Sequence, residues 1–339
     1  MRTAISLIVI FGLSLGAIVY GATRGVDIVR GESASASLPI ETVKLLFVGD
    51  IMPSRWVGHA MKQHGYDFPF ENVRPLLASH DIVFGNLESP VREGRSVGAG
   101  EMRFRTDPSF VPSLARAGVT IVSLANNHIG DEGEVGIAST TAYLAASGIR
   151  WVGVGTTSSA YAPTIVESRG VRVGFVAGND PSIVPASYCA SESRLGSSCF
   201  DKERIAKSIA TARAQADLVV FSMHAGTEYA TTSDPLQRSI ARFAIDAGAD
   251  LVIGHHPHVI QEREHYHGKW IYYSLGNFIF DQEWSRNTKL GLALGIEVQT
   301  QNAQILRSTH TIVRIDHYAQ PQLATPEETA EMYEFLELP

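Results

Sequence analysis

Cysteine and basic residues are scarce in this chain of 339 residues, and each shortage excludes a class of protein. Two cysteines are too few for a disulfide-stapled scaffold or a thiolate metal cluster. Lys and Arg together number 28 against 35 Asp and Glu, so the net charge is −7 and nucleic acid is not an expected partner. With 12 histidines present, any metal chemistry would rest on imidazole and carboxylate ligands.

Three common catalytic or nucleotide-binding motifs are also missing. Beyond position 24 the chain has no Gly-x-Ser-x-Gly elbow of a serine hydrolase, since Ser274 is followed by Leu275 and Gly276. No Walker pattern occurs, and the run VGVGTTS at 152–158 lacks the last glycine of a dinucleotide-binding loop. Instead, 45% of the residues are apolar, which is enough for a sizeable core and excludes a disordered chain.

An uncharged, mostly apolar run fills positions 3–23, between Arg2 and Arg24. Its length is near the ~20 residues that cross a bilayer as a helix, and it exceeds the ~7–15 apolar residues of an ordinary signal peptide. A retained membrane anchor is therefore favoured, with a cleaved signal peptide as the alternative. We expect this segment at 1–24, a flexible linker at 25–42 and one folded domain at 43–339, placed outside the cytoplasm on the cell membrane or secreted after cleavage.

The two cysteines, Cys189 and Cys199, lie ten positions apart in a Ser-rich stretch. Outside the cytoplasm such a pair can close a loop as a disulfide. Two free thiols are the alternative, because sequence does not show whether the geometry is met. The export segment favours the disulfide.

Short apolar, β-branched runs alternate with amphipathic segments along the body, which predicts an α/β fold with parallel strands covered on both faces. Helices are expected after Asp107-Pro108 and after Ser233-Asp234-Pro235, where an acidic cap precedes a first-turn proline. From Gly291 onward the pattern changes to a meander of strands, followed by a terminal helix capped at Thr325. The expected strands are the runs 44–50, 81–88, 119–128, 150–155, 171–180, 217–224, 250–258 and 269–278.

Nearly every one of these runs ends in a residue that can bind a metal or transfer a proton. In open α/β sheets, ligands gather outside the carboxyl ends of the strands, so these side chains are candidates for a common site. Taken singly, each has an ordinary explanation as a turn residue, a solvated loop carboxylate or a hydrogen-bonded histidine. The candidates are Asp50, Asn86, Glu88, Asn126, Asn127, His128, His224, His256 and His258.

The strongest local signal is His256-Pro257-His258. Proline favours an extended conformation of the residue before it, and positions i and i+2 of an extended chain face the same side. We therefore expect His256 and His258 to converge and His255 to face away. The other histidines lack a partnered motif and are expected at the surface; they are His59, His64, His80, His265, His267, His310 and His317.

One Asp, one Glu, one Asn and three His make a mixed nitrogen and oxygen ligand set. Such a set fits two divalent transition ions, Mn, Zn or Fe, better than calcium or magnesium, which favour oxygen ligands. Two such ions about 3.5–4 Å apart would activate a water and hold a phosphoryl oxygen.

The ordered motifs resemble those of the CapA family, the bacterial poly-γ-glutamate capsule synthesis proteins, over roughly residues 43–285. The resemblance implies a branch of the calcineurin-like metallophosphatase superfamily, with a four-layer α/β/β/α sandwich and a dinuclear metal site at the strand ends. The motifs are Gly49-Asp50-Ile51-Met52, Asn86-Leu87-Glu88, Asn126-Asn127-His128, His224-Ala225-Gly226-Thr227-Glu228, Gly254-His255-His256-Pro257-His258-Val259 and Ser274-Leu275-Gly276-Asn277-Phe278.

The resemblance also implies a role for each residue. Asp50 would bind the first metal, Glu88, or else Asn86, would bridge the two ions, and His258 would return to the first. The implied ligands of the second metal are Asn127, His224 and His256. His128 would be the acid that protonates a leaving group. Residues expected in the pocket or behind the ligands are Arg55, Asn86, Asn126, Glu228 and Asn277.

Three departures from the metallophosphatase pattern bear on activity. Met52 stands where the usual motif has a histidine ligand, and thioether sulfur is a poor ligand for hard divalent ions, so the first metal site is expected to be weak. The bridging position is not the usual aspartate. Ala225 replaces a tryptophan that is common after His224 in relatives.

Three functions remain open from the sequence. The first is a membrane-anchored, metal-dependent phosphoesterase-like hydrolase of capsule or poly-γ-glutamate biosynthesis, acting on an envelope polymer or phosphoester. The second is a non-catalytic subunit of a synthesis or export complex, in which bound cations hold the carboxylates of the polymer. The third, an α/β module whose histidines are only structural, is disfavoured because so many of them end strands.

Overall fold

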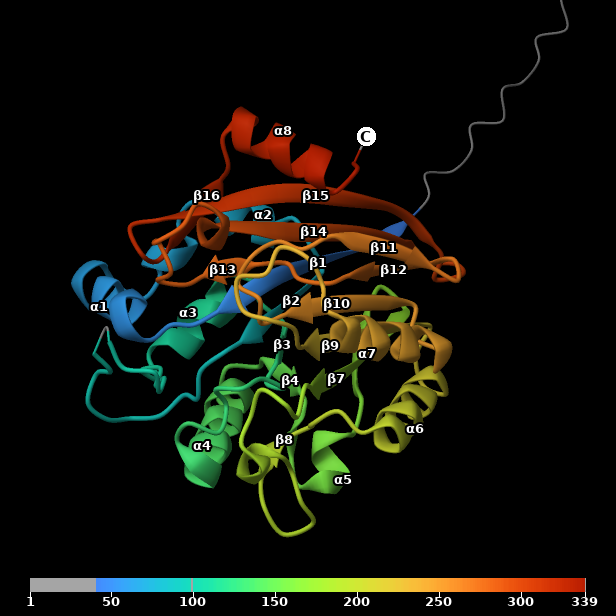
Figure 1. The fold of residues 1–339 in the computed structure, drawn as a ribbon, viewed down its shortest axis with the longest axis horizontal. Coiled ribbons are helices and arrows are strands. Elements are labelled where there is room, and N and C mark those ends of the chain that lie inside the picture. Colours follow the sequence, from blue (N-terminus) through green and yellow to red (C-terminus); the bar gives the residue numbers. More distant parts are fainter. Residues whose placement is uncertain (1–40, 99, 339) are drawn as a thin grey trace, which may run out of the picture. The chain divides into compact units, whose positions relative to one another are not determined.

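The computed structural model describes residues 41–98 and 100–338, in which two β-sheets pack face to face (Figure 1). The first sheet has eight strands in the spatial order β16-β15-β14-β1-β2-β3-β4, with β13 paired to β1. Its strands are β1 (Thr42–Ile51), β2 (Ile82–Leu87), β3 (Ile121–Ser123), β4 (Arg150–Val152), β13 (Asn277–Ile279), β14 (Leu290–Gln299), β15 (Ile305–Asp316) and β16 (Gln320–Leu323).

The second sheet has six strands in the order β11-β12-β10-β9-β7-β6. Its central strands are parallel to one another, as are β1 to β4 of the first sheet, so the chain must cross over between neighbours. The strands are β6 (Thr164–Ser168), β7 (Val171–Asn179), β9 (Leu218–His224), β10 (Leu251–His255), β11 (Arg263–Tyr266) and β12 (Lys269–Tyr272); a separate short pair is β5 (Val154–Gly155) with β8 (Gly196–Ser197).

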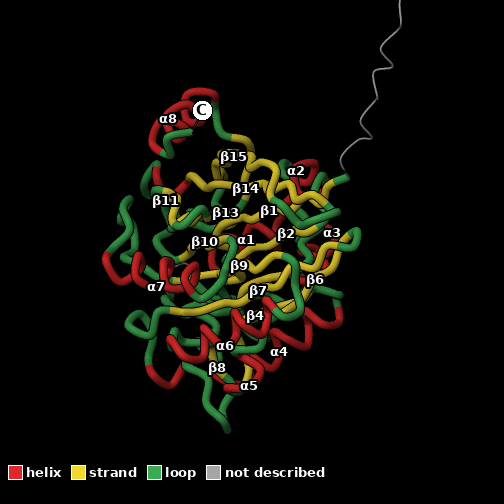
Figure 2. Tube along the Cα trace, turned by 90° about the vertical axis from the view of Figure 1, so that its right-hand side faces the viewer, coloured by secondary structure: helices red, strands yellow, loops and turns green. Residues whose placement is uncertain are grey.

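Helices supply the crossovers and cover the outer faces of the sheets. The helices are α1 (Arg55–His64), α2 (Arg74–Ala78), α3 (Phe110–Arg116), α4 (Gly133–Ala146), α5 (Thr157–Ala160), α6 (Lys202–Arg213), α7 (Pro235–Asp246) and α8 (Pro326–Phe335), with 3-10 turns η1 (Phe68–Phe70), η2 (Ala186–Tyr188) and η3 (Asn287–Lys289). Figure 2 shows the strands in the interior with α4, α6 and α7 outside them.

Three hydrophobic cores hold these layers together. The central core lies between the sheets, where Phe47 and Phe84 of the first sheet meet Phe175 of the second; the rings of Phe84 and Phe175 stack at 5.3 Å. A second core joins the first sheet to α1, α2, α3 and α4, and a third joins the second sheet to α6 and α7. The order is therefore helices, sheet, sheet, helices, and the strand ends of the two sheets are brought close together.

The expected mixed α/β architecture is confirmed, as are the C-terminal strands and two helix starts. Asp234 caps α7 and Thr325 caps α8, each in a capping box with the residue three positions on. The helix expected after Asp107-Pro108 begins later, at Phe110, and Ser109 at its cap makes no side-chain capping bond.

Two apolar runs expected as single strands are each divided. The run at 150–155 breaks at Gly153, whose φ of 94° ends β4. The run at 269–278 leaves the second sheet after Tyr272 and joins the first sheet at Asn277, passing through Gly276 at φ 69°. This second break matters for the site, because it sets Asn277 beside Asp50 in the register of β13 with β1.

Cys189 and Cys199 form a disulfide, with Cα atoms 5.4 Å apart, as expected. The segment expected to cross the membrane, 1–24, and most of the linker expected at 25–42 lie outside the described residues. Within residues 41–98 and 100–338, no helix combines the length and the apolar character that crossing a bilayer requires.

The capping box of α7 allows a stability test. Oδ1 of Asp234 accepts a hydrogen bond from the backbone N–H of Gln237 at 2.8 Å, so Asp234→Ala leaves a helix donor unpaired. We expect a loss of about 1 kcal/mol in the free energy of unfolding, measured by urea denaturation. Asp234→Asn, which can still accept this bond, is the matched control and should retain most of the stability; an equal loss in both variants would contradict the capping role.

Candidate metal centre

Four strand ends meet where the carboxyl edges of the two sheets come together. In the first sheet Asp50 of β1 is in register with Asn86 of β2, and Glu88 follows β2 directly. In the second sheet His224 of β9 is in register with His255 of β10. Because the sheets pack face to face, the polar residues at these ends face one another across the gap.

Two glycines make this close approach possible. A Cβ atom on Gly49, directly before Asp50, would lie 2.0 Å from the backbone oxygen of Gly276. A Cβ atom on Gly254, directly before His255, would lie 1.8 Å from the backbone oxygen of Tyr273. Side chains are excluded at both positions, so the strands can come together and place the next residue in the site.

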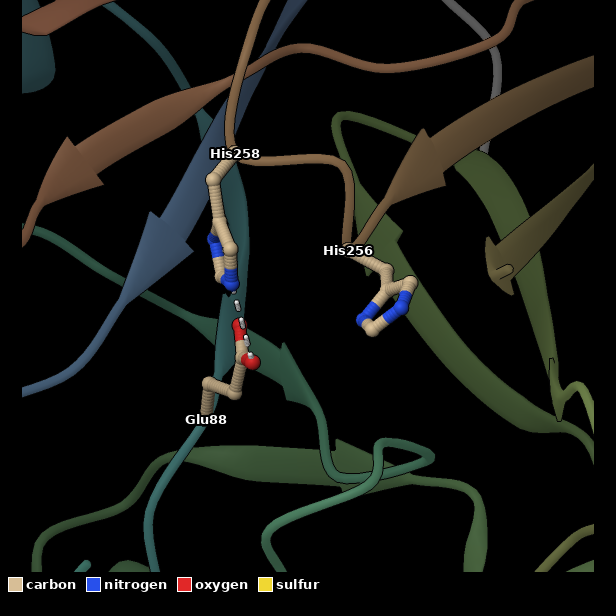
Figure 3. A group of neighbouring side chains, drawn as sticks. All are labelled: Glu88, His256 and His258. Carbon is tan, nitrogen blue, oxygen red and sulfur yellow. Dashed lines mark ion pairs between the residues drawn. The ribbon is translucent and has the colours of Figure 1, made fainter. Parts of the chain in front are cut away.

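Five buried side chains form two overlapping groups with the spacing of metal ligands. Glu88, His256 and His258 make one group, and Asp50, Glu88 and His224 make the other; within each group the candidate ligand atoms lie within 4.8 Å of one another. Figure 3 shows the imidazole of His258 directed at the carboxylate of Glu88, with His256 from the same turn beside them. Glu88 belongs to both groups.

The two carboxylates have opposite electrostatic surroundings. Burial raises the pKa of Asp50, but the imidazoles of His255 and His258 outweigh that effect and hold this pKa well below its usual value. Burial and then the charge of Asp50 raise the pKa of Glu88 well above its usual value. Glu88 is thus a buried carboxylate without enough positive charge around it, which a divalent cation would supply.

The imidazoles and orphaned atoms fit a cation as well. Burial, and next the charge of His256, lower the pKa of His224; burial, and next the charge of His258, lower the pKa of His256 to about 3. Both rings are therefore neutral at pH 7, the state in which imidazole binds metals. Oε1 of Glu88 and Nδ1 of His256 are buried without a hydrogen-bond partner, as expected for atoms that face a cation. The donor set fits a divalent metal.

Three asparagine amides fix the carboxylates and His224. Nδ2 of Asn86 lies 2.8 Å from Oδ1 of Asp50, 3.2 Å from Oε2 of Glu88 and 3.3 Å from Nδ1 of His224. Asn126 donates to Oδ1 of Asn86 at 3.0 Å and thereby sets the orientation of that amide. Oδ1 of Asn127 lies 2.9 Å from Nε2 of His224, which places Asn127 beside the two ligand groups.

Asn277 and Asp50 orient the ring of His258 through its Nδ1. Its Nδ1 lies 3.0 Å from Oδ1 of Asn277 and 3.2 Å from Oδ2 of Asp50, both acceptors, so Nδ1 carries the proton. Nε2 is left with its lone pair, 3.8 Å from Oε1 of Glu88. Nδ2 of Asn277 donates to the backbone oxygens of His258 and Thr288 and to Gln282, which locks the amide that holds the ring.

His128 stands at the edge of the site, outside both ligand groups. Its Nδ1 lies 2.8 Å from Oδ2 of Asp131, and its ring stacks on Phe104 at a centroid distance of 3.8 Å. The carboxylate fixes one ring nitrogen and leaves the other free. A carboxylate-oriented imidazole of this kind can act as a general acid or base.

Arg55 and Glu228 lie near the two ligand groups but outside them. The buried guanidinium of Arg55 pairs with Asp281 and lies over the ring of Phe104, 4.7 Å from its centroid. Glu228 is exposed, and its charge contributes to the raised pKa of Glu88. Met52 is fully buried in the core between the first sheet and its helices, so the position of the missing histidine supplies no ligand.

Three expectations about histidines were wrong. His256 and His258 converge, but in a turn and not in extended chain, since their φ angles are 98° and 59°. His255, expected to face away, is fully buried with Nδ1 3.2 Å from Oδ1 of Asp50, because it ends β10 on the same face as its register partner His224. His310, expected at the surface, is partly buried and shares a 2.8 Å hydrogen bond with Tyr272.

Sequence reasoning also missed Asp131 and Asn179. Asp131 lies three residues after His128, a spacing that could have suggested a paired carboxylate. Asn179 ends β7 in register with His224, is fully buried, and both of its side-chain polar atoms lack a partner. It ends an apolar run as the recognised residues do, which is the signal that was overlooked.

Comparison with known proteins gives concordant results. The model of a family described as bacterial capsule synthesis protein PGA_cap matches residues 44–282. The capsule biosynthesis protein CapA of Bacillus anthracis is 34% identical over 73% of this chain and 62% of its own length, and the PGA biosynthesis protein CapA of Bacillus subtilis (strain 168) is 36% identical over 71% and 64%. The chain thus spans less than two thirds of the length of these relatives.

A solved structure supports the fold. The calcineurin-like phosphoesterase YfkN from Bacillus subtilis superimposes with a TM-score of 0.51 over 87% of this chain and 96% of that chain, at 14% sequence identity. At this identity the likeness concerns the fold alone. The mixed α/β fold is therefore one that resembles calcineurin-like phosphoesterases.

The raised pKa of Glu88 gives a test of the centre. In metal-free protein, ionisation of the buried Glu88 carboxylate lowers the stability of the fold. This loss is absent below pH 4.5, the ordinary pKa of a glutamate, and grows as the pH rises above it. Metal-free Glu88→Gln should therefore unfold at a higher temperature than metal-free wild type at pH 8, by a margin that shrinks toward pH 4.5. Added Mn²⁺ should reverse that order, because the wild type keeps the Glu88 carboxylate that binds the ion and the variant lacks it.

The control for this test is Glu167→Gln, which alters an exposed carboxylate on β6. It should follow the wild type with and without Mn²⁺. If Mn²⁺ stabilises Glu88→Gln as strongly as the wild type, Glu88 is not a ligand.

Proposed function

The chain belongs to the family of bacterial capsule synthesis proteins described as PGA_cap, and from this we propose that it is a CapA-like, metal-dependent phosphoesterase-like hydrolase of capsule or poly-γ-glutamate biosynthesis. The names of the two Bacillus relatives, capsule biosynthesis protein and PGA biosynthesis protein, support the biological setting. The substrate is a phosphoester or polymer of the cell envelope.

One observation carries the proposal of hydrolytic chemistry: the two buried ligand groups share Glu88. A carboxylate common to both groups supports a pair of divalent ions, Mn, Zn or Fe, held by nitrogen and oxygen ligands. When bound, such ions supply Lewis acidity toward a phosphoryl oxygen and make water a stronger acid. The residues that would hold them are Asp50, Glu88, Asn127, His224, His256 and His258.

The other residues of the site have roles in binding and proton transfer. His128, oriented by Asp131, is placed to protonate a leaving group. Arg55 uses Nε and Nη2 on Asp281, which leaves Nη1 without a protein partner among the described residues for a phosphoryl or carboxylate oxygen. Asn86 and Asn277 keep the carboxylates and His258 in position.

A second candidate function is a polymer-binding subunit that does not turn over substrate. The burial of Met52 in the core favours it, because the first ion then lacks a ligand that active metallophosphatases have. Cations held at the same residues would bind carboxylates of a polyglutamate chain. In either case subunits of a capsule synthesis complex are the proposed partners.

We also propose that the protein acts outside the cytoplasm, anchored by the apolar run at 3–23 or secreted after its cleavage. The apolar run is long enough to cross a bilayer. The Cys189–Cys199 disulfide gives separate support, since such bonds persist in oxidising compartments.

Elemental analysis tests the metal centre directly. The purified full chain should contain Mn, Zn or Fe, and His256→Ala should lower the content, because it removes a ligand from one of the two groups. His265→Ala, at a histidine of β11 outside both groups, is the control and should leave the content unchanged. A wild type free of metal after expression in medium supplied with all three would refute the centre.

The leaving group distinguishes the two functions. His128→Ala should lower kcat by about 10²–10⁴ on phenyl phosphate esters, whose leaving group needs a proton, and by much less on p-nitrophenyl esters, whose leaving group does not. His59→Ala is the control, and metal content should be unchanged in both variants. Equal losses on both esters would contradict the role of His128 as acid. No wild-type turnover, together with metal-dependent polyglutamate binding, would select the binding subunit.

A further inference from the structure

Exposed aromatic side chains are concentrated beside the metal centre. Five aromatic side chains are exposed in the described part of the chain, and all but Phe335 of α8 surround Arg55 and Asp281. The four are Trp56 (48% exposed), Tyr229 (43%), Trp284 (63%) and Tyr318 (46%). Apolar surface gathered in this way marks an interaction site.

The four rings form two pairs from four separate segments. Trp56 of α1 stacks on Tyr318 of the β15–β16 turn, with centroids 5.9 Å apart and planes inclined by 29°. Trp284 meets Tyr229 edge to face at 5.8 Å, and Tyr229 lies 6.2 Å from the ring of His258. The aromatic surface therefore extends from the metal centre outward.

Two cavities accompany this surface. One, of about 340 Å³, is lined by Arg55, Trp56, Asp281, Glu283, Trp284 and Tyr318. The other, of about 480 Å³, shares Trp56 and Tyr318 with the first and continues along α1 past His59, His64 and Gln320. We call the two together the aromatic groove. Its size and its mixture of aromatic walls with a few polar groups are typical of a ligand site.

The backbone has unfavourable positive φ angles at or next to three of the exposed rings. Tyr318 has a φ of 59°, Tyr229 of 64° and Arg55, directly before Trp56, of 47°. Glycine or asparagine is favoured at such angles, and a bulky residue there is an outlier that the surrounding structure must hold in place. The strain occurs at three points around one groove.

Charge decides which ligand the groove fits. The guanidinium of Arg55 is paired with Asp281, and the carboxylate of Glu283 accepts from the backbone N–H of Tyr318 and lies 3.9 Å from Nζ of Lys289. The remaining polar lining consists of histidines and glutamines. With its formal charges paired internally, the groove gives little electrostatic advantage to an anionic or a cationic polymer.

We propose that the aromatic groove binds a neutral carbohydrate chain. Sugar rings present apolar C–H faces that stack on aromatic rings and a rim of hydroxyl groups that bond to amides, imidazoles and paired charges, which is the chemistry this groove offers. Trp56 and Tyr318 line both cavities, so the chain continues from one into the other past this pair.

The groove reaches the metal centre through Arg55. The guanidinium lies 4.7 Å from the ring centroid of Phe104 and 5.9 Å from that of Phe280. Phe104 stacks on His128, and Phe280 lies 4.6 Å from His258. A bound glycan would therefore rest directly beside the centre, yet its binding needs no hydrolysis and does not depend on the proposed catalytic function.

Calorimetric titration of the full chain with chitohexaose and cellohexaose tests the proposal. We expect at least one of these neutral oligosaccharides to bind, and Trp56→Ala and Tyr318→Ala each to weaken its binding at least about tenfold, since aromatic anchors dominate such contacts. Phe335→Ala, at the exposed aromatic residue on α8, is the matched control and should bind as the wild type does. Unfolding temperature and metal content, measured alongside, identify any variant that has lost its fold or its metal centre.

Charged probes of the same length separate the alternatives. Hexalysine and γ-linked hexaglutamate should not lose affinity in Trp56→Ala or Tyr318→Ala. The proposal is overturned if neither neutral oligosaccharide binds, if folded Trp56→Ala and Tyr318→Ala bind it as the wild type does, or if a charged probe is the one that these variants lose. None of these outcomes bears on whether the protein hydrolyses phenyl phosphate esters. The proposed function is therefore tested separately.

Discussion

Two carboxylates buried side by side, Asp50 and Glu88, are the constraint on which the site depends. Burial raises the pKa of both carboxylates, and the charge of Asp50 raises that of Glu88 further. The surrounding imidazoles offset this for Asp50 but not for Glu88. An arrangement of this kind persists in a folded protein only where something offsets its cost. The neutral imidazoles of His224 and His256 and the orphaned oxygen of Glu88 together indicate that the offset is a cation.

The fold brings these carboxylates and the imidazoles together at the strand ends. Parallel strands in each sheet point their carboxyl ends the same way, and the face-to-face packing of the sheets sets β1 and β2 opposite β9 and β10. Glycines before Asp50 and His255 let the strands approach so closely that no side chain fits. Asp50 and His224 lie on strands, and Glu88, His256 and His258 come shortly after strand ends. His128, Arg55 and the aromatic groove come from loops and helix ends, which can differ among relatives.

Family membership and local chemistry give complementary information about function. The likeness to calcineurin-like phosphoesterases concerns the fold, and a fold of this kind hosts many chemistries. The structure of this chain shows a buried Met52 beside the ligand groups, and next to them an aromatic groove whose charges are paired and whose backbone is strained. Catalysis is proposed for the centre and polymer binding for the groove, so each can be tested without the other.

The sequence by itself determined the mixed α/β class, the capped helices α7 and α8, and most of the metal-binding candidates, because apolar runs, capping residues and strand-end polar groups are local signals. Only the tertiary structure decided that His255 faces Asp50, that Asn277 reaches His258 and that Trp56 meets Tyr318. Side-chain direction in a turn such as His256-Pro257-His258 depends on left-handed φ angles, and contacts between distant segments depend on how two sheets pack. Neither is encoded in the spacing of residues along the chain.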